Sequence, residues 1–486
     1  MQKEEKRLIQ RLRDYNATDY YPFHMPGHKR NPELGKEYEN PFEIDITEIH
    51  GFDNLHHPEG LLKRSMEWAA DVYGADRTYY LINGSSCGLL AAIFGTTTCG
   101  GTILMSRNCH KAAYNGIFLN HLKADYVYPQ IIGNLGIQGG ILPEDVDNLL
   151  ESDPEIQAVL IVSPTYDGIV SDIEKIAEAA HRYGKPLIVD EAHGAHFAFG
   201  KDFPKSALEL GADVVIQSVH KTLPSFTQTA LLHVRGNLAD REEIERYLGI
   251  FQSSSPSYVF MAGIENCIYH MDRDGRRGME RFYDRLLSLR SALKKMNRLY
   301  LLDRECVGRF GVFDMDPSKI VVSVEKTNIT GADLDRILRE KYHLELEMCC
   351  ADHVVAITTL GDREDGFRRL EQALLELDGK LEEKKEDPDL ESNMEWSSRV
   401  TSKPEVEMTV FDGTTAVKEP VPVENSVGRI SGEFVYIYPP GIPIVAPGEM
   451  LLPSLVRTIG EYQKMGLSVQ GMKDPSGKTI QVVKRS

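Results

Sequence analysis

The sequence predicts an α/β fold built on a mostly parallel sheet, and two observations lead to this prediction. Between residues 77 and 220, short β-branched apolar runs alternate with helix-like segments, which is typical of βαβ units. Two of these runs, residues 186–190 and 213–216, lead into Asp190 and into Ser218-Val219-His220-Lys221. Open α/β sheets bind ligands at the carboxyl ends of their strands, so we expect both tips to face one cleft.

The chain is long enough for several domains and has the composition of a globular protein. It has 486 residues, of which 42% are hydrophobic and 26% charged, and the length indicates two to four domains. It has no run of eighteen apolar residues, so no membrane span is expected. The N-terminus contains acidic residues and lacks the apolar core of a signal peptide.

Cysteine usage and net charge restrict the compartment and the partners. The seven cysteines show no zinc-site spacing, which favours the reducing cytoplasm and no bound metal. The net charge of −18 argues against nucleic acid as a partner and is compatible with a cationic substrate. Many cytosolic proteins are simply acidic and soluble, and for net charge alone this is the simpler explanation.

Residues 1–60 are predicted to form an N-terminal arm. A short amphipathic helix is expected over residues 2–14, followed by the irregular segment His24-Met25-Pro26-Gly27-His28-Lys29. Asp45-Ile46-Thr47-Glu48 comes next. The arm either covers the surface or reaches a cleft, including that of a partner subunit.

The first strands of the predicted sheet lead into candidate ligand-binding turns. A helix over 61–74 and a strand over 77–82 precede a Gly/Ser turn with Ser85 and Ser86, at the start of a helix near 89–94. Such a turn offers backbone N–H groups and hydroxyls to a phosphate, although it also serves as a helix cap. The strand at 102–105 leads to His110, which is either structural or able to stack on a flat cofactor ring.

The remaining elements complete a large domain over residues 61–298 and extend beyond it. Further strands and helices of the large domain are expected at 144–151, 158–162, 171–184, 231–234, 241–250 and 260–297, with a hydroxyl-rich turn around Ser254. A small α+β domain is expected at 299–377, a charged linker at 378–405, and a C-terminal domain with a Pro/Gly-rich loop at 406–486.

A carboxylate and an amine in one cleft suit pyridoxal 5'-phosphate. This cofactor needs a Lys for its Schiff base and an acid that keeps its ring nitrogen protonated. Considered alone, Lys221 is more simply explained as a solvated loop residue, and Asp190 is more simply explained as a helix N-cap. Together, with Ser218 adjacent and several histidines nearby, they favour the cofactor.

The motifs resemble those of the ornithine/lysine/arginine decarboxylases, which belong to the fold-type I (aspartate-aminotransferase-like) class of pyridoxal phosphate enzymes. The residues that carry the resemblance are His24-Met-Pro-Gly-His-Lys29, Asp45-Ile-Thr-Glu48, Asn83-Gly-Ser-Ser86, Arg107-Asn-Cys-His110-Lys111, Asp190-Glu-Ala-His-Gly-Ala-His196, Ser218-Val-His-Lys221, Tyr438-Pro-Pro-Gly-Ile-Pro443 and Pro447-Gly-Glu449. They span almost the whole chain, and they are most similar to the compact bacterial branch that includes the arginine decarboxylases of Gram-positive bacteria.

The resemblance implies a role for each candidate residue. Lys221 would form the Schiff base, Asp190 would pair with the pyridine nitrogen, and His110 would stack on the ring, with Ala192 and His193 on its other side. The phosphate would be held by Ser85, Ser86, Ser218 and His220, with Ser254 reaching it from a neighbouring subunit. His220 or Lys221 would return the proton to Cα. Glu449, or the pair Asp45 and Glu48, would bind the cationic tail of the substrate.

The implied reaction is α-decarboxylation of a basic L-amino acid, with release of CO2, in polyamine biosynthesis in the cytoplasm. Arginine, giving agmatine, is favoured; lysine to cadaverine or ornithine to putrescine comes next. The arm motif begins by residue 24 and leaves no room for the wing domain of the acid-inducible branch, so we expect a homodimer with a shared active site, or a tetramer of dimers. The rivals are an aminotransferase or aldolase of the same fold, and a non-catalytic protein that binds the cofactor.

Overall fold

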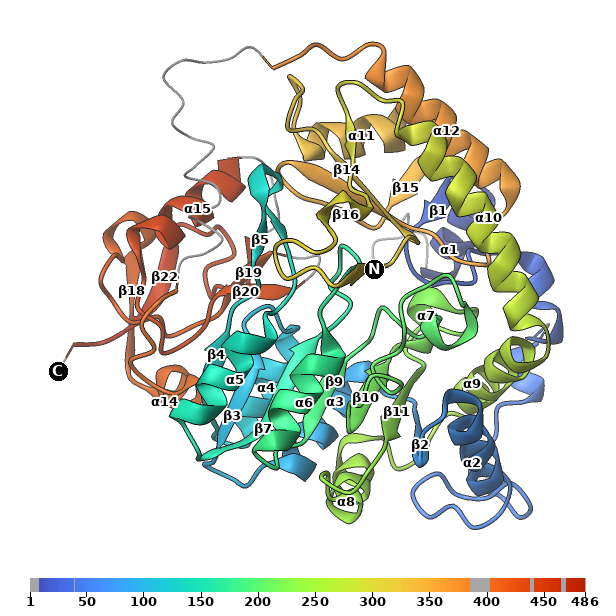
Figure 1. The fold of residues 1–486 in the computed structure, drawn as a ribbon, viewed down its shortest axis with the longest axis horizontal. Coiled ribbons are helices and arrows are strands. Elements are labelled where there is room, and N and C mark those ends of the chain that lie inside the picture. The colour runs from blue at the N-terminus through green and yellow to red at the C-terminus, as the bar shows by residue number, and fades with distance from the viewer. Residues whose placement is uncertain (1–7, 39, 385–402, 438–440, 465–468, 486) are drawn as a thin grey trace, which may run out of the picture.

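The computed structural model describes residues 8–38, 40–384, 403–437, 441–464 and 469–485. A seven-stranded sheet occupies the middle of the large domain (Figure 1). In pairing order its strands are β2 (Arg77–Leu81), β11 (Ala230–Val234), β10 (Val214–Gln217), β9 (Leu187–Asp190), β7 (Ile156–Val162), β3 (Thr102–Ser106) and β4 (Lys123–Val127). Only β11 runs antiparallel to its neighbours in this sheet, so the predicted mostly parallel α/β sheet is confirmed.

Alternate side chains of the central strands enter two separate cores. In β7, Val159 and Ile161 pack in one cluster, and Ala158 and Leu160 pack in the other. This follows from the two-residue period of a strand that is covered on both faces. Strands of this kind are continuous apolar runs in the sequence, so their positions could be predicted well.

Helices cover both faces of the sheet (Figure 1). One face carries α5 (Pro143–Ser152), α6 (Ile173–Arg182), α2 (Leu61–Tyr73), α9 (Tyr258–His270) and α10 (Arg276–Leu293). The other carries α3 (Gly84–Thr96), α4 (Lys111–Leu119) and α8 (Arg241–Phe251). The single long helix predicted over 260–297 is wrong in one respect, because a π-helical segment, Met271–Gly275, separates α9 from α10. An extra residue in a turn shifts the helical register, and apolar periodicity does not reveal it.

The small α+β region packs above the carboxyl edge of the sheet. Its four strands, in pairing order, are β12 (Tyr300–Leu301), β14 (Lys319–Ser323), β17 (His353–Ile357) and β16 (Met348–Cys349). Its helices are α11 (Gly331–Tyr342) and α12 (Glu364–Asp378), and α12 runs beside α10 (Figure 1). β13 (Asp314–Met315) pairs with β8 (Ile169–Val170) of the large region and joins the two.

The N-terminal arm is tied to the small region of the same chain. It consists of α1 (Leu8–Asn16) and β1 (Tyr21–Phe23), which pairs in parallel with β15 (Leu344–Leu346). Gly27 donates its N–H to the carbonyl of His220 at 2.7 Å and accepts a bond from the Thr359 hydroxyl at 2.6 Å. A Cβ on Gly27 would lie 2.7 Å from the Leu223 carbonyl oxygen, so only glycine fits this passage.

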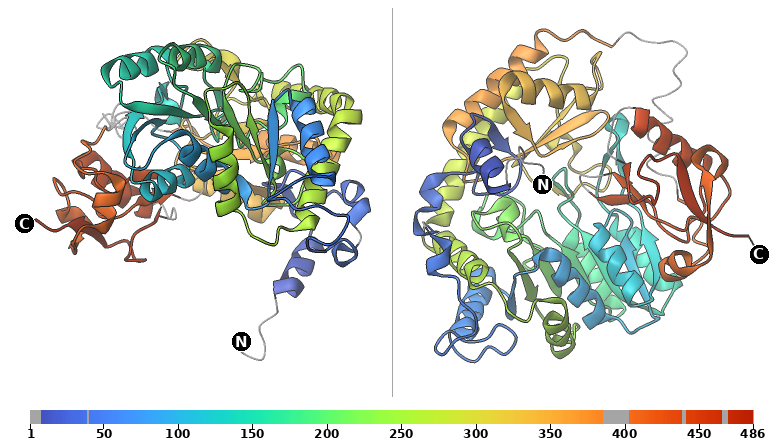
Figure 2. Two further views of the ribbon diagram at one scale, coloured as in Figure 1. Left: turned by 90° about the horizontal axis from the view of Figure 1, so that it is seen from below. Right: turned by 180° about the vertical axis from the view of Figure 1, so that it is seen from behind.

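The C-terminal region lies to one side of the large sheet (Figure 2). It contains α14 (Val410–Thr415), β18 (Lys418–Pro422), β19 (Val435–Ile437), β20 (Ile442–Val445), α15 (Pro453–Lys464), β21 (Val469–Gln470) and β22 (Thr479–Val483). β18 pairs with β22, and β19 lies between β20 and β21. A hairpin of the large region, β5 (Ile131–Ile132) and β6 (Ile137–Gln138), reaches up beside α15 (Figure 1).

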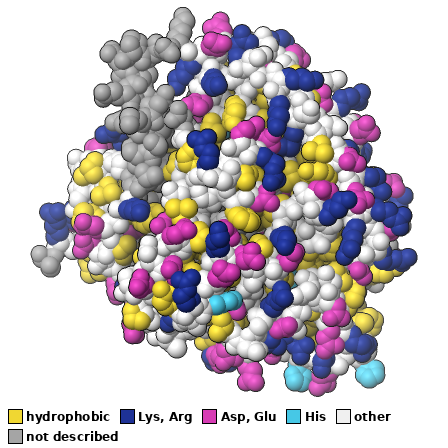
Figure 3. All heavy atoms as spheres, viewed as in Figure 1, with side chains coloured by type: hydrophobic (Ala, Val, Ile, Leu, Met, Phe, Trp, Pro, Cys, Tyr) yellow, Lys and Arg dark blue, Asp and Glu magenta, His cyan; other side chains and the backbone are white. Residues whose placement is uncertain are grey.

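Some sequence predictions concern residues outside the described ranges. These are the start of the predicted helix 2–14, most of the predicted linker 378–405 and residues 438–440 of the Pro/Gly-rich motif. No helix in the described ranges is long and apolar enough to cross a membrane. Figure 3 shows acidic and basic side chains interspersed over one face, so on that face the net charge of −18 forms no single acidic patch.

Candidate active site

A cavity of about 970 Å³ opens where the parallel strands end, and it contains most of the predicted site residues. Loops that follow β2, β3, β7, β9 and β10 line it, together with the arm, the small region and the C-terminal region. The predicted residues among its walls are Ser85, Ser86, His110, Asp190, Ala192, His193, Ser218, His220 and Lys221. Its size is at the upper end of the range for small-molecule sites.

Lys221 and Asp190 lie in this cavity as the strand-end reasoning requires. Lys221 belongs to the short helix α7 (Val219–Thr222), and its Nζ lies 3.0 Å from Nε2 of His193. Burial, with the charge of Lys319, lowers the pKa of Lys221. Burial also raises the pKa of Asp190, which is 5% exposed and accepts the N–H of Ala192 at 3.1 Å.

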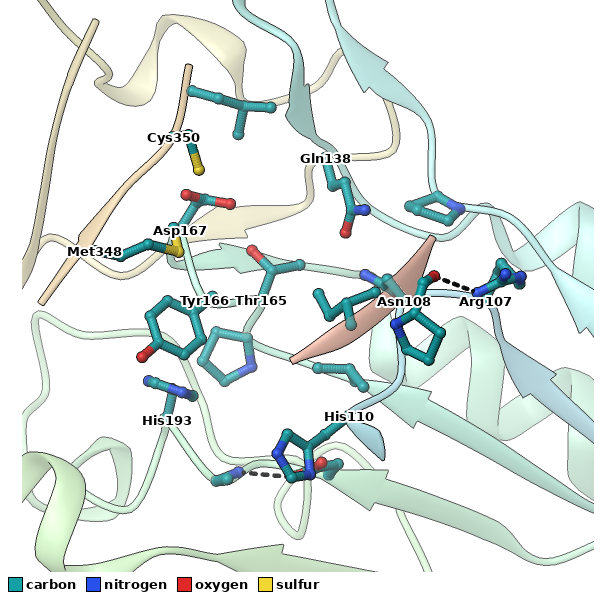
Figure 4. Close-up of a pocket in the computed structure, with 18 of the residues that line it drawn as sticks. Arg107, Asn108, His110, Gln138, Thr165, Tyr166, Asp167, His193, Met348 and Cys350 are labelled. Atoms are coloured by element: carbon teal, nitrogen blue, oxygen red, sulfur yellow. Dashed lines mark hydrogen bonds between the residues drawn. The ribbon is translucent and has the colours of Figure 1, made fainter. Parts of the chain in front are cut away.

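Two histidines, His110 and His193, lie near the Lys221 amine. Figure 4 shows both side chains in the cavity. His110 caps α4, and its Nδ1 accepts the N–H of Ala112 at 3.2 Å. Burial and the nearby lysines lower the pKa of His110 to about 4, so its ring is neutral and flat. Burial also lowers the pKa of His193, whose Nδ1 is buried and has no hydrogen-bond partner in the described part of the chain.

Hydroxyl groups and a helix N-terminus meet in one corner of the cavity, as predicted for an anion site. The Oγ atoms of Ser85 and Ser218 lie 2.5 Å apart, and Ser85 and Ser86 occupy the first turn of α3. Gly84 opens this turn with a φ of 74°, which favours glycine. His220 lies on the same cavity wall, where its Nδ1 contacts the Thr229 carbonyl at 2.8 Å and burial lowers its pKa to about 4.

Asp45, Glu48 and Ser254, like Glu449, are not among the described residues that line the cavity of their own chain. Asp45 and Ser254 are exposed, and Glu48 is half-buried on the arm. The prediction that Ser254 acts from a neighbouring subunit stays a prediction. The arm itself does reach the cavity of its own chain, through His24 and Met25.

Glu449 has a different environment from the one expected for a ligand of the substrate tail. It is 1% exposed, and its carboxylate forms a two-point ion pair with Arg107, at 3.1 Å to Nε and 3.0 Å to Nη2. Its Oε2 also accepts the N–H of Ala446 at 2.8 Å. These contacts give both carboxylate oxygens a hydrogen-bond donor, and Glu449 is not among the described residues that line the cavity. The expectation that Glu449 binds the tail is therefore corrected: its partner is Arg107.

The cavity also contains acidic residues that the sequence did not single out. Asp167 follows β7, and Glu347 lies between β15 and β16. Glu347 accepts hydrogen bonds from the Tyr166 hydroxyl and, at 2.8 Å, from the N–H of Met25. Asp167 followed a predicted buried strand, as Asp190 did, so the strand-end argument could have found it. Glu347 belongs to the small region and carried no comparable signal.

The comparisons with known proteins agree on one family. The family model for the Orn/Lys/Arg decarboxylase major domain matches residues 7–365, and that for the C-terminal domain matches residues 397–470. An arginine decarboxylase of Bacillus anthracis is 32% identical, over 99% of this chain and 97% of its own length. One of Halalkalibacterium halodurans is 34% identical, over 95% and 94%. The structure of a Francisella novicida lysine decarboxylase aligns with a TM-score of 0.78 at 18% identity, covering 98% of this chain and 80% of that one, and supports the fold.

Proposed function

The chain belongs to the Orn/Lys/Arg decarboxylase family, whose members are amino-acid decarboxylases of the fold-type I class, and we propose that it uses pyridoxal 5'-phosphate to remove the α-carboxyl group of a basic L-amino acid as CO2. The observation that carries the proposal is the meeting of Lys221 and Asp190 in one cavity. We further propose arginine as the preferred substrate, because full-length relatives more than 30% identical are named arginine decarboxylases.

The residues present fit the cofactor. Ser85, Ser86 and Ser218 would hold its phosphate at the N-terminus of α3. His110 would lie against its ring, and Asp190 would bind the ring nitrogen. The unpartnered, buried Nδ1 of His193 leaves a polar group in this wall for a ligand to satisfy. When bound, the cofactor supplies an electron sink for the charge that remains at Cα after CO2 leaves.

Lys221 and Asp190 both need to be deprotonated, Lys221 as a neutral amine and Asp190 as a carboxylate. Burial favours the neutral amine of Lys221, and a neutral amine is the form that attacks a carbonyl. With the cofactor bound, Asp190 would have to be ionised to keep a proton on the pyridine nitrogen. Burial opposes this, whereas the hydrogen bond from the N–H of Ala192 favours it.

His220 is a poor candidate for the group that protonates Cα. The Thr229 carbonyl can only accept a hydrogen bond, so Nδ1 of His220 carries the ring proton. With a pKa of about 4, His220 is neutral near pH 7, and its Nε2 is then unprotonated. A neutral His220 is a poor acid, and we assign it to the phosphate end of the site instead.

We propose that the protein acts in the cytoplasm, in polyamine formation, as a homodimer with a shared active site. Ser254 and the acidic pair Asp45 and Glu48 lie on surfaces outside their own cavity. Exposed apolar side chains on the same arm, Phe42 at 86% and Phe52 at 44%, support a second copy as the partner of this face.

The test is an amine analysis of the cofactor-loaded protein given arginine, lysine or ornithine separately, with Lys221→Ala as the control. One dominant amine, absent from the control, is expected. Formation of a keto acid instead would favour an aminotransferase. Bound cofactor with no amine and no keto acid would favour a non-catalytic role.

A further inference from the structure

The end of the cavity away from His110 carries a second carboxylate, that of Asp167. Figure 4 shows Asp167 beside Met348 and Cys350, on the side of the cavity opposite His110. The side chain comes from the loop after β7 and is 12% exposed. If the reacting Cα lies beside His110, a group at the opposite end would face the tail of the substrate.

The contacts of Asp167 leave part of its charge unbalanced. Its Oδ1 lies 3.2 Å from Nε2 of His353, and Nδ1 of that ring lies 2.7 Å from Oδ1 of Asp352. Burial lowers the pKa of His353, but Cys350, Asp167 and Asp352 outweigh burial and raise it well above its ordinary value. One imidazolium between two carboxylates leaves a net charge of −1. Among the described residues, Oδ2 of Asp167 has no hydrogen-bond donor.

Glu347 is the other acidic candidate in the cavity, and it already accepts hydrogen bonds from neutral donors. Both of its oxygens accept hydrogen bonds, one from Tyr166 and one from Met25. Its charge also acts on Lys221, which places it toward the reacting end rather than the far end. Asp167 is therefore the better partner for a cation at the far end.

We propose that Asp167 binds the cationic tail of the substrate and selects basic over neutral side chains. The inference rests on the proposed function and names the residue that sets its substrate class. A buried carboxylate whose oxygen lacks a hydrogen-bond donor is stabilised when a cation takes the place of water. An ammonium or a guanidinium group supplies such a cation. The far wall is completed by Tyr462 of α15, whose pKa is raised by burial and by its acidic neighbours there, so the C-terminal region closes this end.

The test compares arginine with citrulline, its neutral isostere, in the wild type and in Asp167→Asn. If lysine or ornithine proves to be the substrate, 2-aminoheptanoate or norleucine, respectively, takes the place of citrulline, since each carries a methyl group in place of the terminal ammonium. The variant keeps the shape of the side chain and removes its charge. We expect kcat/KM for the basic substrate to fall by about 30-fold or more, mainly through KM, as when one partner of a desolvated charge pair is removed. The value for the neutral analogue should change little.

Two control variants isolate the effect. Asp202→Asn removes one negative charge from an exposed position and should leave the discrimination unchanged. Asp167→Glu keeps the charge but advances it by one methylene group, so it should retain discrimination and shift preference toward a shorter basic side chain. If Asp167→Asn fails to fold, Asp167→Glu carries the test, and an unchanged length preference would overturn the inference.

Failure of the inference and failure of the proposed function give different results. If the wild type makes an amine and Asp167→Asn discriminates as well as the wild type, Asp167 is not the tail ligand and the decarboxylase proposal stands. If the wild type makes no amine, the proposed function fails. Calorimetric binding of agmatine, cadaverine and putrescine then decides the inference: weaker binding to Asp167→Asn supports it, and equal binding overturns it.

Discussion

Replacing Glu449 by Gln should loosen the C-terminal region without changing substrate affinity. Glu449 and Arg107 join this region to the loop after β3, with side-chain exposures of 1% and 9%. Removing one partner of such a buried pair costs about 3–5 kcal/mol. Gln keeps the volume and one acceptor oxygen, so we expect the low end, about 3 kcal/mol, or about a hundredfold in an opening equilibrium.

The assay is hydrogen exchange of backbone amides in residues 403–485, followed by mass spectrometry. Exchange from the locally opened state should accelerate by about the same hundredfold in Glu449→Gln. The control is Glu419→Gln, which breaks a more exposed pair with Arg429 and should cost less than about 1 kcal/mol.

Two results would refute this reasoning. Exchange as slow as in the wild type would mean that the pair with Arg107 does not hold the C-terminal region in place. A large rise in KM for the basic substrate, with exchange unchanged, would return Glu449 to the role of tail ligand.

Acid should destabilise the protein, and replacing Gly168 should lower both its stability and its activity. Burial lowers the pKa of His110 and His220 to about 4, and that of His233 to about 3, from about 6.5 in the unfolded chain. Between these values only the unfolded chain takes up the protons, so stability is complete above pH 6.5 and is lost as the pH falls toward 4. Melting temperatures should follow this, and His233→Gln should flatten the profile; a melting temperature constant over this range would contradict it. Gly168→Ala should destabilise the protein by about 1–2 kcal/mol or more, because φ is 89° and a Cβ would lie 2.8 Å from Cγ of Lys319. It should also lower kcat/KM through the adjacent carboxylate, and unchanged melting and kinetics would speak against this.

The sheet and its ligand-binding tips could be predicted because their signals are local. A buried parallel strand is an uninterrupted apolar run, and the residue after it must lie at the carboxyl edge of the sheet. Asp190, Lys221 and His110 were located in this way, and the structure brings all three into one cavity.

The charge pairing within the site could not be predicted, because it depends on residues far apart in the chain. The partner of Glu449 is Arg107, 342 positions away, and no periodicity links them. Glu347 enters the cavity from a part of the chain that has no recognisable motif. Composition alone therefore could not separate an acidic side chain that is already neutralised from one that is open to a ligand.

The route of the N-terminal arm has a consequence for synthesis on the ribosome. Tyr21 bonds to Asp362, Lys29 bonds to the carbonyl of Ile357, and β1 pairs with β15. Residues 21–29 must therefore wait for more than three hundred later residues before they find their places. At about 5–20 residues per second this delay is roughly 15–60 s. During this time the nascent chain exposes Phe23, which ends fully buried, and an early chaperone contact at this segment would shorten its exposure.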